Sequence, residues 1–190
     1  IVYLVEEIGG KSGNNISRER LIVWKYLCPK QYVRDIHRIN LNSLKEKGIR
    51  GIIMDLDNTL VPWNDNAVVP EVMNWIEKVK KSGFEACIVS NNDGRRREDI
   101  TEIFDLPAFW KAVKPRRRTF RKAIKMMGLK PSQVAVIGDQ VFTDILGGNR
   151  LGLYTILVRP LNKREFIGTM CVRKLEKIVL FGLRRKGYLK

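Results

Sequence analysis

Residues 50–60 read Arg-Gly-Ile-Ile-Met-Asp-Leu-Asp-Asn-Thr-Leu. The apolar run at 52–54 is typical of a buried strand, and it leads directly into Asp55 and Asp57, with Thr59 behind them. In an open α/β sheet, the carboxyl ends of the strands border the crevice where ligands bind. Two carboxylates this close repel one another, so a cation has to lie near them. Mg²⁺, which prefers oxygen ligands, is the natural candidate.

Two other interpretations of this acidic segment have to be weighed. An EF-hand loop needs Gly at its sixth position and Glu at its twelfth, where this chain has Leu60 and Asn66. Such a loop also follows a helix, whereas this segment follows a strand-like run. An acidic turn remains open from the motif alone, because Asp and Asn are ordinary turn residues.

Composition limits the classes of protein and site that the chain can form. With 190 residues, 44% of them hydrophobic, the chain can form a core without covalent cross-links. Cys28, Cys87 and Cys171 are far apart, which fits neither a disulfide framework nor a CxxC metal site, so we expect reduced thiols. Because His37 is the one histidine, a zinc cluster of several histidines is excluded, as is a Ser-His-Asp triad built elsewhere.

The net charge of +16 is distributed unevenly along the chain. Residues 111–130 carry nine Lys or Arg and no acid, and residues 150–190 carry eleven Lys or Arg and two acids, whereas residues 51–110 hold eleven acids against six bases. This pattern predicts an anionic partner, which could be nucleic acid, anionic lipid or a phosphorylated substrate, although a solubilising surface would look the same. No apolar run approaches the roughly 20 residues that span a bilayer. We therefore expect a cytoplasmic protein, with a peripheral position at the inner membrane surface left open.

The rest of the chain alternates strand-like and helix-like segments. Further strands are expected at 84–90, near 109–113, at 134–139 and at 153–158, with helices at 70–83, 95–104, 117–127 and from Asp144 onward. This order predicts an α/β fold: a three-layer α/β/α sandwich around about five mainly parallel strands. The polar residues that follow the strand ends should meet at one edge of the sheet. They are Asp55 and Asp57, Ser90 and Asn91, Lys114, and Asp139 with Asp144.

That set of residues suits phosphoryl transfer. The carboxylates can hold a divalent cation, while Lys114 and the Ser90 hydroxyl can stabilise the charge that develops on a phosphoryl group. A carboxylate such as Asp55 can attack phosphorus to form an aspartyl-phosphate. A second carboxylate, Asp57, can protonate the leaving oxygen and then activate water.

The same residues resemble the four ordered motifs of the haloacid dehalogenase (HAD) phosphatase superfamily. The motifs here are Asp55-x-Asp57-x-Thr59, Ser90-Asn91, Lys114-Pro115 and Gly138-Asp139-x-x-x-x-Asp144. The resemblance implies that Asp55 is the nucleophile, Asp57 the general acid and base, and Lys114 the charge stabiliser. It also implies that Ser90 and Asn91 contact phosphate and that Thr59 orients Asp57. Mg²⁺ would be held by Asp55, the backbone carbonyl of Asp57, and Asp139, with Asp144 supporting the metal or its waters.

The spacing of the motifs leaves no room for an inserted cap domain. The intervening segments have 32 residues from Asp57 to Ser90, 23 from Ser90 to Lys114, and 24 from Lys114 to Asp139. In the HAD superfamily, a missing cap implies a large or surface-bound phosphoester. We expect residues 26–190 to form a single capless HAD-like phosphatase domain with a basic C-terminal helical segment, preceded by an N-terminal extension of unknown role at 1–25.

A narrower resemblance is to the bacterial YqeG subfamily, which is similar to the fungal mitochondrial phosphatidylglycerophosphatase. It is carried by residues 51–63, 138–152 and 163–166, and it extends over about residues 29–188. It implies Mg²⁺-dependent hydrolysis of phosphatidylglycerophosphate (PGP) to phosphatidylglycerol and phosphate, on a lipid headgroup.

Two basic segments leave the partner open. A helix expected at 169–186 puts apolar residues on one face with Lys and Arg around it, so it could lie on an anionic membrane or pack on the sheet. The cluster at 116–122 follows Lys114 and could bind lipid phosphate or an RNA backbone.

Three other functions remain as alternatives. One is a broad-specificity sugar or nucleotide phosphatase, and a second is a basic RNA- or ribosome-binding protein with a vestigial site, which lacks the motifs of common RNA modules. The third is a receiver domain, against which the Thr59 spacing and Ser90-Asn91 argue. The oligomeric state is not predicted.

Overall fold

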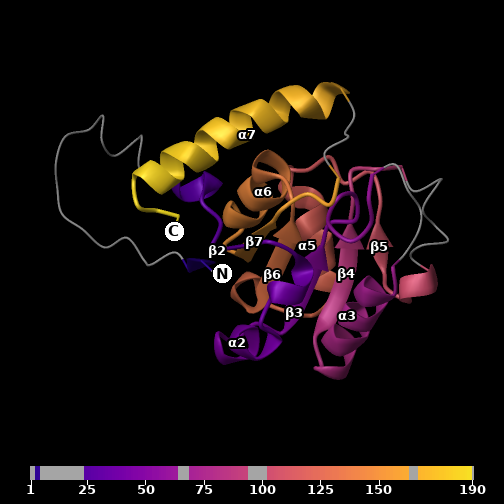
Figure 1. The fold of residues 1–190 in the computed structure, drawn as a ribbon. Helices are drawn as coiled ribbons and strands as arrows, with labels where there is room; N and C mark the ends of the chain where they lie inside the picture. Colours follow the sequence, from indigo (N-terminus) through magenta and orange to yellow (C-terminus); the bar gives the residue numbers. More distant parts are fainter. Residues whose placement is uncertain (1–2, 5–23, 64–68, 94–101, 163–166, 190) are drawn as a thin grey trace.

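The computed structural model describes residues 3–4, 24–63, 69–93, 102–162 and 167–189. Within these ranges seven strands form one sheet, in the order β1-β2-β7-β6-β3-β4-β5 (Figure 1). The strands are β1 (Tyr3–Leu4), β2 (Gln31–Val33), β3 (Gly51–Met54), β4 (Glu85–Val89), β5 (Ala108–Phe109), β6 (Val134–Gly138) and β7 (Tyr154–Val158). All neighbours pair in parallel except β1 and β2. The expected α/β fold with a mainly parallel sheet is confirmed.

The strands differ from the prediction in two respects. β1 and β2 were not expected, since segments of two and three residues are too short to show the alternation by which a strand is recognised. The third expected strand, near 109–113, is shorter and ends at Phe109. Beyond it Lys111 and Val113 adopt positive φ values of 50° and 52°, so the chain leaves the extended conformation.

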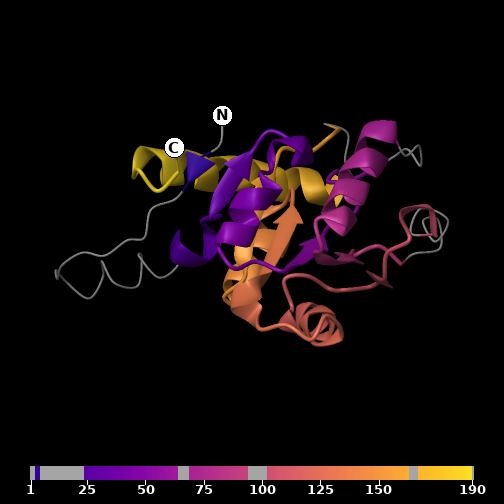
Figure 2. The same ribbon diagram turned by 90° about the horizontal axis from the view of Figure 1, so that it is seen from below.

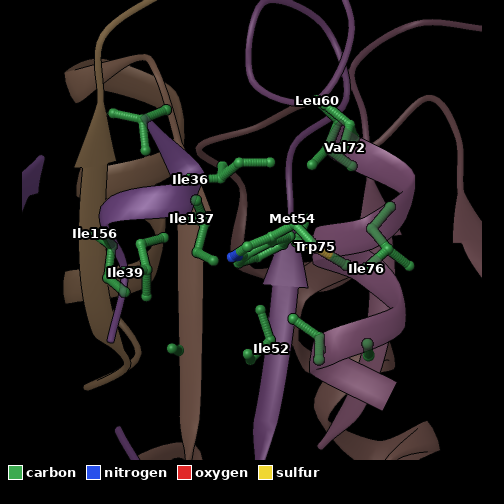
Figure 3. Close-up of a cluster of buried hydrophobic side chains, with 14 of the residues drawn as sticks. Ile36, Ile39, Ile52, Met54, Leu60, Val72, Trp75, Ile76, Ile137 and Ile156 are labelled. Carbon is green, nitrogen blue, oxygen red and sulfur yellow. The ribbon is translucent and has the colours of Figure 1, made fainter. Parts of the chain in front are cut away.

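Helices cover both faces of the sheet. α2 (Leu41–Glu46) and α3 (Pro70–Lys81) lie on one side, and α5 (Arg117–Met126) lies on the other (Figure 2). Because successive side chains of a strand point to opposite faces, β3 contributes to both layers of the core. Ile52 and Met54 pack with α3, and Ile53 packs with α5. Figure 3 shows Trp75 and Ile76 of α3 against Met54 in the first of these layers.

Local sequence explains where α3 begins and ends. Pro70 occupies the first helical turn, where its missing N–H leaves no hydrogen bond unmade. The buried residues recur at helical spacing and face the sheet: Val72, Trp75, Ile76 and Val79. Gly83 then adopts a φ of 76°, which ends the helix and turns the chain into β4. The predicted helix at 70–83 is therefore confirmed within its ends.

Three other expected helices have different outcomes. Most of the helix predicted at 95–104 lies outside the described residues, although 102–104 are helical. The helix expected from Asp144 begins earlier, as a π-helix at Val141–Ile145 that continues into α6 (Leu146–Asn149). The C-terminal helix is confirmed as α7 (Ile167–Arg185). The motif at 163–166 lies outside the described residues.

The strand order places a topological switch point at the end of β3. From β3 the chain moves outward through β4 to β5, and then returns to the other side of β3 for β6 and β7. Met54 at the end of β3 pairs with Ile88 on one side and with Ile137 on the other. Crevices for ligands form outside the carboxyl ends of strands at such a point. The segments after β3, β4 and β6 therefore meet at one place.

No separate domain is inserted at this edge of the sheet in the described ranges. The connection from β3 to α3 comprises residues 55–69 and the one from β4 to β5 comprises residues 90–107, and both are too short for an inserted domain.

α7 lies above α6, beside the end of the sheet toward which the strands point (Figure 1). Among the described residues, no helix has the length and apolar content needed to cross a membrane.

Candidate active site

Asp55 is the first residue after β3 and lies at the centre of the site. Its backbone N–H donates to the carbonyl of Ile137 in β6 at 2.9 Å, so the end of the sheet fixes its position. The side chain is buried. Burial in this place has to be compensated, because an isolated buried carboxylate is strongly destabilising.

Lys114 supplies that compensation. Its Nζ donates to Asp55 Oδ1 at 2.6 Å and to Asp144 Oδ1 at 2.7 Å, and its side chain is only 3% exposed. The backbone N–H of Lys114 donates to Asn91 Oδ1 at 2.7 Å, so the segment after β4 holds the segment that carries the lysine. Three residues far apart in the sequence thus form a buried charged group.

Asp144 reaches the group because residue 138 is glycine. A Cβ atom at Gly138 would lie 2.2 Å from Asp144 Cγ, which is too close for any side chain. The second carboxylate oxygen of Asp144 accepts from the Gln140 N–H and the Thr143 hydroxyl, each at 3.2 Å. The π-helix therefore folds back on β6 and presents Asp144 to Lys114.

Asp55, Asp139 and Asp144 could hold a divalent cation together. Each offers one carboxylate oxygen, these oxygens lie within 4.8 Å of one another, and all three residues are buried. An all-oxygen set of anionic donors fits Mg²⁺ and similar hard cations rather than zinc or copper. The side chain of Asp57 is not part of this cluster, so any contact of Asp57 with the metal would have to use its backbone, as the resemblance to HAD phosphatases implies.

Asp57, Ser90, Thr59 and Asn91 surround this cluster. The Ser90 hydroxyl donates to Asp57 Oδ2 at 3.2 Å and accepts from the Asn92 N–H at 3.0 Å. The Thr59 hydroxyl donates to Asp139 Oδ1 at 3.4 Å, which places Thr59 on the metal side of the site. Its expected role in orienting Asp57 stays a prediction. Asn91 is exposed beside Lys114, and its role in binding phosphate also stays a prediction.

The structure brings all eight predicted residues to one edge of the sheet and adds two that were not predicted. Arg173 of α7 donates through Nη1 to the backbone carbonyl of Asp139 and through Nη2 to the Asp139 carboxylate. Arg173 Nη1 also contacts Glu176 Oε2 at 2.9 Å, and Glu176 Oε1 accepts from the Phe142 N–H at 3.2 Å. Arg173 therefore links the C-terminal helix to a candidate metal ligand.

A signal for this pair exists in the sequence. Glu176 is the one acid in the 19 residues of α7, and it stands three residues after Arg173, a spacing at which two side chains of a helix meet. An isolated acid in a basic helix indicates a specific partner. The pattern does not say that the partner reaches Asp139.

Burial and nearby charges shift the pKa values of Asp55, Asp139 and Lys114. Burial raises the pKa of Asp55 to about 7, against the opposing effect of Lys114 and with further raising by Asp144 and Asp57. Burial also raises the pKa of Asp139 well above its ordinary value, although Arg173 acts in the opposite direction. Burial alone would lower the pKa of Lys114, but Asp144 and Asp55 raise it above its usual range. The raised pKa values favour proton uptake by Asp55 and Asp139 in the absence of a metal, so cation binding at these two carboxylates should release protons.

Two family models match this chain. The family described as mitochondrial PGP phosphatase matches residues 12–105, and the HAD-hydrolase-like family matches residues 112–161. The first range contains the candidate residues up to Asn91, and the second contains Lys114, Asp139 and Asp144.

Three relatives show the extent of the similarity. "Probable phosphatase YqeG" of Bacillus subtilis (strain 168) is 41% identical over 165 residues, which are 87% of this chain and 96% of that protein. "Phosphatidylglycerophosphate phosphatase 1, chloroplastic/mitochondrial" of Arabidopsis thaliana is 32% identical, over 86% of this chain and 50% of that protein. "Phosphatidylglycerophosphate phosphatase 1, chloroplastic" of Chlamydomonas reinhardtii is 27% identical, over 75% of this chain and 57% of that protein. This chain thus spans about half the length of these last two relatives.

Proposed function

Because the chain belongs to the YqeG family of HAD-type phosphatases, we propose that it hydrolyses PGP to phosphatidylglycerol and phosphate, with Mg²⁺ as its cofactor. The observation that carries the chemistry is the buried contact of Lys114 with Asp55, beside the carboxylates of Asp139 and Asp144. The similarity to a PGP phosphatase family over residues 12–105, and to two relatives named for that activity, supports the substrate.

Each residue has a defined part in the proposed reaction. Asp55 attacks phosphorus, and the bond between phosphorus and the ester oxygen breaks while Asp57 gives its proton to the leaving glycerol oxygen. Asp57 then takes a proton from water. The water oxygen attacks phosphorus and breaks the bond to Asp55, which releases phosphate and restores the carboxylate.

Lys114 and Ser90 stabilise the charge on the transferring group. The ammonium of Lys114 already lies against Asp55 Oδ1. It is therefore close enough to the nucleophile to contact an oxygen of the phosphoryl group that Asp55 attacks. Ser90 follows the end of β4, and its hydroxyl lies within hydrogen-bond distance of the Asp57 carboxylate. Mg²⁺ at Asp55, Asp139 and Asp144 would add positive charge that lets an anionic nucleophile approach an anionic ester.

The absence of a cap among the described connections supports a large phosphoester as substrate. The short connections after β3 and β4 leave this edge of the sheet without an inserted domain over it, so a headgroup still attached to its lipid could reach Asp55. We also propose that the protein works from the cytoplasm at the surface of an anionic membrane. The excess of Lys and Arg at 111–130 and 150–190 supports this location by charge complementarity.

The experiment is a phosphate-release assay with Mg²⁺, comparing PGP in mixed micelles with soluble sugar and nucleotide phosphates. We expect the lipid to be preferred, and we expect turnover to fall by at least about a thousandfold for Asp55→Asn and Asp57→Asn. Glu85→Gln, an exposed acid at the opposite edge of the sheet, is the matched control and should keep wild-type turnover.

Each alternative function predicts a different result. Equal turnover of lipid and soluble phosphates would favour a broad-specificity phosphatase. Full activity of Asp55→Asn would refute the aspartyl-phosphate route. Salt-dependent RNA binding by both wild type and Asp55→Asn, without phosphate release, would favour an RNA-binding protein.

A further inference from the structure

The two faces of α7 have different surroundings. One face packs on the body of the protein: Leu183 is buried against Cys28 and Leu189, and Val179 and Leu180 are half-buried beside Tyr32. The prediction that the apolar residues of this helix share one face is therefore only partly correct. Leu183 and Val179 face the protein, whereas Leu175 and Ile178 are exposed.

The outer face combines apolar and basic side chains. Lys174, Ile178, Phe181 and Arg185 are spaced at i, i+4, i+7 and i+11, so they form one row along the helix. The residue Ile178 is 66% exposed and Phe181 is 67% exposed, and Leu175 at the side of the row is 56% exposed. We call these five residues the outer row. Large apolar side chains exposed together on one element indicate a contact surface.

We propose that the outer row docks α7 on an anionic lipid bilayer. This proposal rests on the proposed function, because the bilayer is the surface on which a lipid substrate would be presented. Ile178, Phe181 and Leu175 would enter the boundary between headgroups and acyl chains, while Lys174 and Arg185 would reach the anionic headgroups with their charged ends. Each basic residue near such a surface adds attraction to anionic lipid.

Charge distinguishes this partner from a second copy of the chain. The outer row is flanked by the exposed residues Lys177 and Arg184, and no described exposed residue of α7 is acidic. Glu176, the one acid of the helix, is buried and held by Arg173 and the Phe142 N–H. Two copies that met through this face would bring like charges together, whereas an anionic bilayer complements them.

The inner face of the same helix connects the docking surface to the active site. Arg173 binds both the carboxylate and the backbone carbonyl of Asp139, so the position of α7 is fixed relative to the end of β6. Arg116, Arg117 and Arg118 are also exposed, and they follow Lys114 after one intervening residue, Pro115. A bilayer that meets the outer row would therefore lie close to the edge of the sheet that carries Asp55.

The test is sedimentation of the full chain with vesicles of phosphatidylglycerol and phosphatidylcholine, and with vesicles of phosphatidylcholine alone. The main variant is Ile178→Ser with Phe181→Ser. Met126→Ser is the matched control, because Met126 is an exposed apolar residue at the far end of α5. We expect wild type and Met126→Ser to bind anionic vesicles and the double variant to bind at least about tenfold more weakly. Lys174→Glu should weaken binding at low salt.

Several outcomes would overturn the proposal. These are a wild-type protein that does not bind anionic vesicles, a double variant that binds as well as wild type, and binding that is equal on both kinds of vesicle. Dimerisation in solution that the double variant abolishes, with vesicle binding intact, would assign the surface to a second copy.

Phosphate release from a soluble phosphomonoester separates this proposal from the proposed function. Normal release without vesicle binding would refute the docking surface and leave the phosphatase. Vesicle binding without phosphate release from any substrate would refute the proposed function and leave the docking surface. Circular dichroism of the double variant shows whether the fold is retained, and Lys174→Glu tests the same surface without changing an apolar residue.

Discussion

Replacing Arg173 with Met removes the guanidinium that lies between the carboxylates of Asp139 and Glu176. The side chains of these three residues are 16%, 0% and 4% exposed, so water cannot take the place of the lost charge. Removing one partner of a buried ion pair typically costs about 3–5 kcal/mol of folding free energy. The cost here should fall at or below the lower limit of this range, because Glu176 keeps the Phe142 N–H and burial already favours the protonated forms of both acids.

We therefore expect Arg173→Met to lower the free energy of unfolding by about 2–3 kcal/mol in EDTA. For a chain of this length that corresponds to a fall in Tm of roughly 5–10 °C. The assay is thermal unfolding followed by circular dichroism, with and without Mg²⁺. Part of the loss should be recovered with Mg²⁺, since a cation at Asp139 restores positive charge there. The free energy of unfolding of Arg173→Lys should lie between those of wild type and Arg173→Met, because one ammonium cannot make both contacts of the guanidinium.

Lys177→Met is the matched control for Arg173→Met. Lys177 is exposed and stands one turn further along α7, so its loss should change stability by no more than about 0.5 kcal/mol. An Arg173→Met protein that unfolds at the wild-type temperature would refute the inference that Arg173 compensates buried charge. Equal losses of stability in Arg173→Met and Lys177→Met would show instead that stability depends on the net charge of α7.

Three further predictions concern the centre of the site. Lys114→Met should reduce turnover of a soluble phosphomonoester by roughly a hundredfold or more, because Asp55 and Asp144 lose their shared cation; near-normal turnover would contradict this. Gly138→Ala should cost about 1–3 kcal/mol in urea unfolding, since the new Cβ displaces Asp144, and it should weaken Mg²⁺ binding measured by calorimetry. The third prediction concerns pH. Asp55 binds its proton more tightly when folded, with a pKa of about 7 against 3.8, so its contribution to stability is largest below 3.8 and is lost as pH rises to about 7. In EDTA, wild type should therefore lose more stability than Asp55→Asn between about pH 5 and about pH 8, and parallel profiles would exclude Asp55 as the cause.

Much of the site could be predicted because parallel strands end at the same edge of a sheet. An apolar run followed by Asp55, and similar runs before Ser90 and Asp139, are local patterns that require no knowledge of distant contacts. The order of the segments then brings these residues together. β1 and β2 escaped prediction because their few residues carry no period, and the short β5 ends where Lys111 and Val113 adopt left-handed conformations that neither residue type favours.

The sequence by itself determined the α/β class, the strand ends that carry the carboxylates, and the resemblance to HAD phosphatases. Only the tertiary structure decided that Lys114 joins Asp55 to Asp144 and that Arg173 of α7 holds Asp139, 34 residues earlier in the chain. It also decided which apolar residues of α7 are buried and which form the outer row. Periodicity shows which side chains share a face of a helix, but what covers that face depends on packing between segments that are distant in the sequence.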